Sequence, residues 1–207
     1  GQGAGSLWQR THTSTMNMGT GFISTYVNNM AKMDGVKIMT STTGKELVKD
    51  ENGNITGVTA EDVNGNTYTF TATKGVILAT GGFAANGEMI AQYNTSDKWK
   101  DTDLSKVKTT NRMACSQGDG ITMALSAGAS LSQMDQIQLL YLGNVKDGQL
   151  TKYPPRCVNG TDQEIFINKE GKRFVQEDGR RDQICLASLE QTDGMFYFLE
   201  SGDGADF

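Results

Sequence analysis

Residues 75–83 read GVILATGGF, and this stretch decides what kind of fold the rest of the chain builds. Its first five residues are apolar on both faces, which is typical of a strand buried inside an α/β sheet. The strand would end at Ala79, after which Thr80, Gly81 and Gly82 contribute little side chain beyond one hydroxyl. Bare backbone at the end of a strand lets a flat cofactor approach the main chain closely. An ordinary glycine-rich turn after a core strand is the alternative interpretation.

The segments before this stretch predict a helix followed by a small antiparallel sheet. Apolar residues recur at helical spacing over residues 20–31, which predicts an amphipathic helix. Strands are expected over residues 36–39, 46–50, 55–62 and 67–72. Asn52-Gly53 and Asn64-Gly65 separate the last three strands, and Asn-Gly is a strong hairpin signal because both residues tolerate positive φ. Together with strand 75–79, these elements form one half of a nucleotide-binding domain of the α/β class.

The remaining residues predict a second, smaller set of elements. In chain order these are a helix over 86–93, a polar loop to 108, a helix over 120–127, a strand over 164–168 with a turn after it, a helix over 182–189 and a strand over 195–199. Residues 138–160 are expected to form an irregular connection. A domain boundary is placed near residue 139, which gives domains 1–138 and 139–207.

A second glycine-rich turn, SQGDG at residues 116–120, precedes the helix expected over 120–127. Backbone N–H groups at the start of a helix form a natural site for an anion or a carbonyl oxygen. Gly118, Asp119 and Gly120 are therefore candidate ligand contacts. Asp119 also has a purely structural interpretation, because a carboxylate at this position satisfies free N–H groups and interacts favourably with the helix dipole.

Composition and charge argue against several classes of partner. The chain has 19 lysines and arginines against 24 acidic residues, a net charge of −5 and no basic run, so nucleic acid is not expected to bind. No apolar run reaches the roughly 18–20 residues that span a bilayer, so no membrane insertion is expected. Cys115, Cys157 and Cys185 stand far apart and only one histidine is present, which disfavours a metal site.

A third segment, INKEGKRFVQEDGRRD at residues 167–182, completes a pattern with residues 75–83 and 116–129. In order and approximate spacing the three segments resemble the flavoprotein subunits of fumarate reductase and succinate dehydrogenase. The resemblance is closer to their soluble single-chain relatives, which reduce fumarate, urocanate and similar unsaturated acids. It implies FAD as cofactor, part of a Rossmann-like FAD-binding domain with a β-meander over 1–138, and the beginning of an α+β capping domain over 139–207.

The resemblance also implies which residues contact the cofactor. They are His12, Ala79, Thr80, Gly81, Gly82, Gly118, Asp119 and Gly120. His12 is included because family members carry a histidine near the cofactor just before the first helix, and a structural or solvated histidine is the alternative. The glycines at 1, 3 and 5 follow no strand and are interpreted as a linker. The strand–turn–helix that binds the FAD pyrophosphate is therefore expected outside this chain.

Arg181, the last arginine of the third segment, matches the proton donor of the fumarate reductases. Arginine is a poor acid because its pKa exceeds about 12, so it donates only if a neighbouring relay reprotonates it. Its guanidinium also suits a substrate carboxylate and the charge that develops as hydride reaches the β-carbon. The alternative is a set of surface ion pairs between the arginines at 180 and 181 and the carboxylates of Glu177, Asp178 and Asp182.

The chain departs from the fumarate reductases at the expected substrate contacts. After the Met-x-x-Ile-Gln run that precedes a substrate-binding histidine in those enzymes, this chain has Leu139, Leu140 and Tyr141. Near the position of their threonine-glutamate and second arginine it has Arg156. Tyr141 and Arg156 are therefore the candidate substrate contacts, although a core tyrosine and a surface arginine are equally compatible with the sequence. An aromatic or larger unsaturated acid or enone fits better than a C4 dicarboxylate.

The implied activity is reduction of an activated C=C bond by hydride from flavin N5, with an external electron donor. Flavin-dependent dehydrogenases of succinate or of 3-ketosteroids share the domain plan and run the reverse chemistry. A non-catalytic α+β binding module is the third hypothesis. The segment alone is expected to be inactive, because it carries only part of the cofactor site, and the sequence assigns no compartment.

Overall fold

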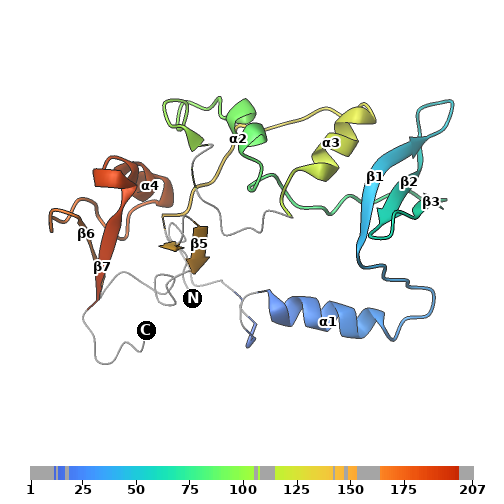
Figure 1. Ribbon diagram of the computed structural model, residues 1–207, viewed down its shortest axis with the longest axis horizontal. Helices are drawn as coiled ribbons and strands as arrows, with labels where there is room; N and C mark the ends of the chain where they lie inside the picture. Colours follow the sequence, from blue (N-terminus) through green and yellow to red (C-terminus); the bar gives the residue numbers. More distant parts are fainter. Residues whose placement is uncertain are drawn as a thin grey trace. The chain divides into compact units, whose positions relative to one another are not determined.

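The computed structural model describes residues 12, 14–16, 19–104, 107, 115–141, 143–146, 149–152 and 164–200. The chain divides into two compact units, one formed by residues 1–28 with 138–207 and the other by residues 29–137. Both contain helices and antiparallel strands (Figure 1), so the mixed α/β fold class is confirmed. The division into domains 1–138 and 139–207 stays a prediction.

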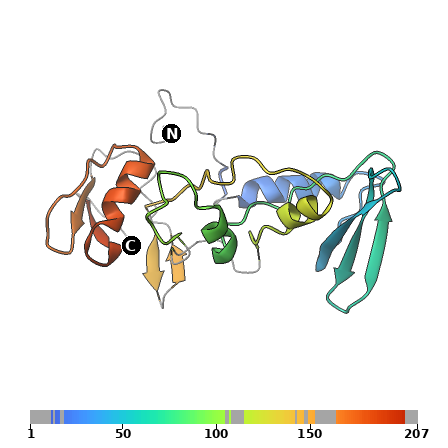
Figure 2. The ribbon, with the colours of Figure 1, turned by 90° about the horizontal axis from the view of Figure 1, so that it is seen from above.

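An antiparallel meander is the main sheet of the unit of residues 29–137. Its strands are β1 (Thr42–Lys49), β2 (Ile55–Asp62) and β3 (Thr67–Thr71), hydrogen-bonded in the order β1-β2-β3 (Figure 2). The central strand β2 contributes the buried Ala60. β1 begins four residues earlier than the predicted strand over 46–50, and β2 matches its predicted range. The predicted meander is therefore confirmed.

The same five-residue turn closes both hairpins of the meander, as DENGN at 50–54 and DVNGN at 62–66. In each, the leading aspartate accepts hydrogen bonds from the backbone N–H groups two and four residues later, at 2.8 to 3.0 Å. It also accepts one from the side-chain amide four residues later, at 2.9 Å. The Asn-Gly pairs thus turn where predicted, and the aspartate fixes each turn from one side.

Asp62 is the more strongly hydrogen-bonded of the two aspartates. The Tyr68 hydroxyl donates to its Oδ2 at 2.9 Å, in addition to the turn contacts. The hydrogen bonds accepted by this carboxylate, chiefly that from the Asn66 side chain, lower the pKa of Asp62 from 3.8 to about 2. Asp62 therefore stays ionised well below the range in which ordinary aspartates titrate.

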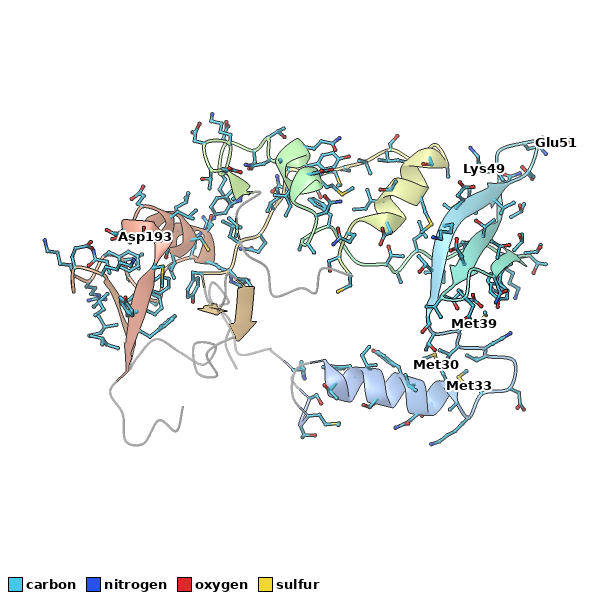
Figure 3. All side chains as sticks on the ribbon, in the orientation of Figure 1. Met30, Met33, Met39, Lys49, Glu51 and Asp193 are labelled. Atoms are coloured by element: carbon cyan, nitrogen blue, oxygen red, sulfur yellow. The ribbon has the colours of Figure 1, made fainter. Side chains whose placement is uncertain are left out.

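Two short helices follow the meander in the same unit, α2 (Gly87–Tyr93) and α3 (Asp119–Ser126). Asn86 is the N-cap of α2, and its side chain accepts from the Met89 N–H at 3.0 Å. α3 packs against β1, where the Met123 thioether lies beside Gly44. Lys49, labelled in Figure 3, donates to a carbonyl at the end of α3, at 3.5 Å. Both predicted helices are confirmed to within one residue at each end.

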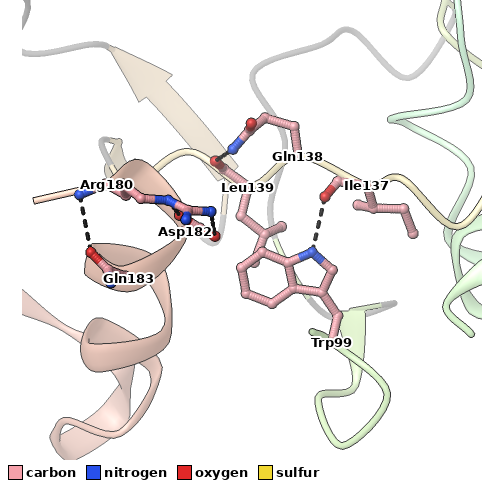
Figure 4. Close-up of polar contacts among 7 residues, drawn as sticks. All are labelled: Trp99, Ile137, Gln138, Leu139, Arg180, Asp182 and Gln183. Atoms are coloured by element: carbon pink, nitrogen blue, oxygen red, sulfur yellow. Dashed lines mark hydrogen bonds and ion pairs between the residues drawn. The ribbon is translucent and has the colours of Figure 1, made fainter. Parts of the chain in front are cut away.

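The loop between α2 and α3 folds around Trp99, which is only 1% exposed. Its indole N–H donates to the Ile137 carbonyl at 2.9 Å (Figure 4). The Asn94 side-chain amide donates to the carbonyls of Trp99 and Thr102, at 2.9 and 3.0 Å. The described part of the predicted polar loop is therefore organised by a buried aromatic ring.

The other unit contains an antiparallel pair formed by β6 (Glu164–Asn168) and β7 (Phe196–Glu200), with α4 (Arg181–Leu189) and the short 3₁₀ helix η2 (Thr192–Gly194) between them in sequence. Phe166 of β6 is 1% exposed, and its ring centroid lies 4.9 Å from that of Phe198 and 5.2 Å from that of Phe196. The buried residues of α4 include Ile184 and Cys185. Burial raises the pKa of the Cys185 thiol to about 12.

Two predicted strands do not form. Residues 36–39 and 75–79 have no regular secondary structure and pair with no strand in the described part of the chain. Ile77, at the centre of the expected buried strand, is 92% exposed. A strand exists only when a neighbour satisfies its N–H and C=O groups, and no described segment supplies one here. Both strand predictions are therefore wrong, because neither segment forms the hydrogen bonds of a strand.

α1 (Thr20–Met30) forms over the predicted residues, but none of its residues is buried. Phe22, Ile23 and Tyr26 on its apolar stripe are all exposed. The predicted helix is therefore confirmed, although no described residue covers the stripe.

The predicted irregular connection over 138–160 contains a hairpin of β4 (Asn144–Lys146) and β5 (Gln149–Lys152). Asp147-Gly148, which separates these strands in the sequence, is a hairpin signal of the same kind as Asn-Gly.

We expect Asp62 to contribute to stability against acid. Because its pKa is lower in the folded state than the ordinary 3.8, its ionised form stabilises the fold above about pH 4, and that contribution is lost as the pH falls toward about 2. Asp62→Asn should therefore lose less stability between about pH 5 and pH 2 than the wild type, as measured by urea unfolding followed by circular dichroism. Glu51→Gln, at an exposed carboxylate of the neighbouring turn, is the control and should behave like the wild type. Equal acid sensitivity of Asp62→Asn and wild type would contradict this expectation.

A second prediction concerns the core beneath α4. Ile184 is 0% exposed, so Ile184→Ala should leave a cavity and lower the free energy of unfolding by about 2–5 kcal/mol. Leu186→Ala removes an apolar side chain from the same helix at a partly exposed position and should have a clearly smaller effect. Denaturant unfolding of the two variants measures the difference, and equal losses would show that α4 does not bury Ile184 in solution.

Candidate functional site

The two glycine-rich segments lie side by side although about 35 residues separate them in the sequence. The Gly118 N–H donates to the Gly82 carbonyl at 3.1 Å, and the Ala85 N–H donates to the Ser116 carbonyl at 3.0 Å. The Asn86 side-chain amide donates to the Gln117 carbonyl at 2.9 Å. With a further one from the Gln117 side-chain amide to the Ala85 carbonyl, at 3.5 Å, these hydrogen bonds join the segment after residue 79 to the turn that starts α3.

Missing side chains make this approach possible at two glycines. A Cβ atom at Gly118 would lie 2.6 Å from the Met89 sulfur and 3.2 Å from the Phe83 Cβ, and Gly118 also has φ +86°. A Cβ atom at Gly120 would lie 2.0 Å from the Thr80 hydroxyl oxygen. A side chain at either position would force Met89, Phe83 or Thr80 to move. Thr80 therefore packs against the first turn of α3.

The backbone on the other side of this junction is open. Residues 79–82 are exposed, and a Cβ at Gly81 or Gly82 would have no atom within 4 Å. Asp119, the first residue of α3, is also exposed, while Gly118 and Gly120 on either side of it are buried. The arrangement offers uncovered main chain and a helix start to a flat, polar molecule.

Arg181 lies in the other unit, as the first residue of α4. Its neighbour Arg180 is the N-cap, and the Arg180 guanidinium pairs with the Asp182 carboxylate at 2.9 Å (Figure 4). The Arg180 N–H donates to the Gln183 side chain at 3.3 Å. Arg181 is exposed and forms no ion pair with any residue that the structure describes. The ion-pair alternative thus holds for Arg180 and not for Arg181.

The remaining predicted contacts have different surroundings. His12 is exposed. Tyr141 packs its ring against Phe166 of β6, with centroids 5.7 Å apart, so it contributes to the aromatic cluster of that unit. Arg156 lies outside the described residues. The assignment of these three residues to a site stays a prediction, as does that of Arg181 and of the glycine-rich contacts.

Two residues missed at the sequence level help to build these segments. Asn86 both caps α2 and holds the 116–120 turn through the Gln117 carbonyl. Its position just before a helix was the available signal. Glu177, considered only as a surface partner of the arginines, is instead 5% exposed and bonded to Arg173 and to the Phe166 backbone. Neither this pairing nor the burial was signalled by the sequence, because a spacing of four residues brings side chains together on a helix and residues 173–177 are not helical.

Neither a metal site nor a membrane span is found in the described part of the chain. No group of three or more histidine, cysteine, aspartate or glutamate side chains is placed to hold an ion there. Within the same residues, no helix combines the length and apolar character that crossing a bilayer requires.

The comparison with protein families decides the assignment. The model of the FAD binding domain family matches residues 3–195. The chain belongs to this family. FAD is therefore its cofactor, as the resemblance implied.

Individual relatives agree with this membership. The chain is 36% identical over 198 residues to the NADH:acrylate oxidoreductase of Vibrio harveyi, covering 94% of the chain and 18% of that protein. It is 37% identical over 202 residues to the urocanate reductase of Eggerthella lenta, covering 92% of the chain and 30% of that protein. The solved open conformation of a flavocytochrome c3 fumarate reductase superposes with a TM-score of 0.68 and 26% identity over 91% of the chain and 31% of that structure. The chain thus spans less than a third of the length of each of these relatives.

The described residues fit part of an FAD site. The uncovered main chain of residues 79–82 allows the close approach that a flat ring system needs, and the tight packing of Gly118 and Gly120 fixes the start of α3 beside it. Backbone N–H groups at such a helix start suit polar oxygens of the cofactor. Asp119 is the one negative group at this position and suits hydroxyl groups rather than phosphates.

We expect Gly118→Ala to impair flavin retention. The new methyl group would collide with Met89 and Phe83, in a backbone conformation that alanine disfavours, so the junction of the two segments should open. Gly128→Ala is the matched control, because Gly128 has φ +97° but a Cβ there meets no atom within 4 Å. The ratio of flavin to protein absorbance in the purified complete protein measures the effect. Flavin content equal to that of the Gly128→Ala variant would contradict the expected collision.

Proposed function

We propose that the chain is part of an FAD-dependent oxidoreductase that reduces the activated C=C bond of an unsaturated acid or related enone. Family membership and the relatives named for acrylate, urocanate and fumarate chemistry support this reaction class. The observation that carries the assignment of roles is the exposed guanidinium of Arg181 at the first position of α4, with no ion pair among the described residues. A guanidinium held at a helix start and not neutralised by a carboxylate is available to an anionic substrate.

Arg181 performs two tasks in this proposal. Its guanidinium holds a substrate carboxylate through paired N–H donors and stabilises the negative charge that develops during reduction. It then donates a proton to the carbon next to the one that receives hydride, and it is reprotonated by a neighbouring relay because its own pKa is high. FAD, when bound, supplies the hydride from N5 to the β-carbon of the substrate.

The cofactor contacts in this proposal are the two joined glycine-rich segments, through Ala79 to Gly82 and Gly118 to Gly120, together with His12. Tyr141 and Arg156 are the proposed substrate contacts. An external electron donor regenerates the reduced flavin. An aromatic or larger unsaturated substrate is favoured over a C4 dicarboxylate, because Leu139 and Leu140 precede Tyr141 where the fumarate reductases place a histidine.

The experiment uses the complete protein that contains this chain, purified with its flavin. Acrylate, fumarate, urocanate and cinnamate are each supplied with reduced methyl viologen, and oxidation of the dye is followed. We expect turnover of at least one of these acids, and a loss of kcat of about 10²–10⁴-fold in Arg181→Gln without loss of bound flavin. Arg180→Lys keeps the charge and the neighbouring ion pair and should retain turnover.

Three results would contradict the proposal. A colourless protein that does not retain FAD would support the binding module. Oxidation of succinate or of a 3-ketosteroid without reduction of any unsaturated acid would support the dehydrogenase. Wild-type kcat in Arg181→Gln would remove Arg181 from the proton-transfer step while leaving the reaction class intact.

A further inference from the structure

Glu177 is a buried carboxylate at the centre of a hydrogen-bond network. It is 5% exposed, and its Oε1 accepts from the Phe166 backbone N–H at 2.9 Å. The Arg173 guanidinium is bidentate, with Nε 3.0 and 3.1 Å from the two carboxylate oxygens and a terminal nitrogen 2.5 Å from Oε2. Burial alone would raise the pKa of Glu177, but these donors outweigh it and lower that pKa, so the group is ionised.

Stability gives a weak reason for this arrangement. Removing the Glu177 charge from water is costly, and the Arg173 side chain that pairs with it is 60% exposed, so solvent weakens the attraction between the two groups. The network does fix geometry, because a bidentate pair allows few relative orientations. We therefore ask which part of the chain the Glu177–Arg173 network holds in place.

One end of the network is a rigid point of the sheet. Phe166 is 1% exposed, and its ring contacts those of Tyr141, Phe196 and Phe198. Its N–H, which points to Glu177, therefore has little freedom. Arg173 follows the turn after β6, and a β-bridge joins it to Ile167. The carboxylate at Phe166 and the β-bridge at Ile167 thus tie this segment to β6 at two adjacent positions.

The other end of the network leads directly to Arg181. Between Glu177 and α4 the backbone is closed by a hydrogen bond from the Gly179 N–H to the Gln176 carbonyl, at 3.1 Å. The next residue, Arg180, is held by Gln183 and Asp182 (Figure 4). Arg181 follows at once as the first residue of the helix. The buried carboxylate and the proposed proton donor are therefore joined by a short, hydrogen-bonded stretch of backbone.

The far end of α4 is held by the same strand. The Asn168 side chain donates to Gln191 at 3.0 Å, and the Gln191 amide donates to the Ala187 carbonyl at 2.8 Å. Strand β6 therefore fixes both ends of the helix, through Glu177 before it and through Gln191 after it. With both ends tied to β6, the position of the α4 backbone, including its first residue, is set by this strand.

We propose that Glu177, paired with Arg173, is a positioning residue that fixes the Arg181 guanidinium for proton donation. The inference depends on the proposed function, because it concerns the orientation of the proton donor assigned there. Glu177 itself touches no substrate in this proposal. A misplacement of the donor by about 1 Å is enough to reduce turnover by about 100-fold.

The test compares kcat of the complete flavin-loaded protein with the best of the four acids named above and reduced methyl viologen. We expect Glu177→Gln to lower kcat by about 10–100-fold while KM and bound flavin change little. Asp178→Asn, the same chemical change at the exposed neighbouring carboxylate, should leave kcat unchanged. Arg173→Lys keeps the charge but loses the bidentate geometry, and it should also lower kcat.

A double-mutant cycle separates positioning from a general structural effect. If Glu177 acts through Arg181, Glu177→Gln should cost little further kcat in an Arg181→Lys background, because the oriented donor is already lost. An equal loss in both backgrounds, or wild-type kcat in both Glu177→Gln and Arg173→Lys, would overturn the inference. Wild-type kcat in Arg181→Gln would instead overturn the assignment of Arg181.

Amide hydrogen exchange provides a measurement that needs no substrate and does not require Glu177→Gln to fold. In Arg173→Lys, the N–H groups of Ile184 and Cys185, in the first bonded turn of α4, should exchange faster than in the wild type, while those of β1 and β2 should not change. Unchanged exchange in α4 would show that the network does not hold the helix and would overturn the inference even if no acid is turned over.

Discussion

The hydrogen bond from the Gly118 N–H to the Gly82 carbonyl holds together the two segments that are proposed to contact the cofactor. It requires two main chains to approach within a distance that side chains would prevent, and Met89, Phe83 and Thr80 already fill the space around the glycines. Because the close packing is on one side only, residues 79–82 keep their outer backbone uncovered. The same absence of side chains therefore allows the close packing of α3 and leaves the backbone of residues 79–82 open to solvent.

In the unit that contains α4, a charged side chain, that of Arg181, lies at the start of a helix, where the helix dipole disfavours a cation. Aromatic packing around Phe166 supplies the rigid support. The buried Glu177 and its exposed partner Arg173 connect this support to the segment before α4. Arg180 is neutralised by Asp182, so one of two adjacent arginines is used for structure and the other remains available. Sequence proximity does not distinguish the two arginines, whereas their positions as N-cap and first helical residue do.

Local signals predicted the elements whose stabilising contacts are local. The Asn-Gly turns, the helix that Asn86 begins and the turn after Asn168 all formed as expected, because their hydrogen bonds join residues within five positions of one another. The strand expected at 75–79 did not form, because a ladder needs a distant partner that periodicity cannot reveal. The burial of Glu177 could not be predicted either, because it depends on a hydrogen bond from the Phe166 backbone N–H, eleven residues away in the sequence. The proximity of Thr80 and Gly120 was expected only from the resemblance to a family. Such a resemblance indicates contacts between residues distant in the sequence, which a single sequence does not reveal.

The attachment of α4 to a single strand at both of its ends has a mechanical consequence. A helix tethered at one end can swing like a lever, and its first residue can then travel independently of the sheet. Two tethers to β6, through Phe166 and through Asn168, remove that freedom. Any displacement of the Arg181 backbone must then carry strand, helix and intervening turn along as one solid block, so the distance between the start of α4 and the aromatic cluster stays constant throughout such a movement.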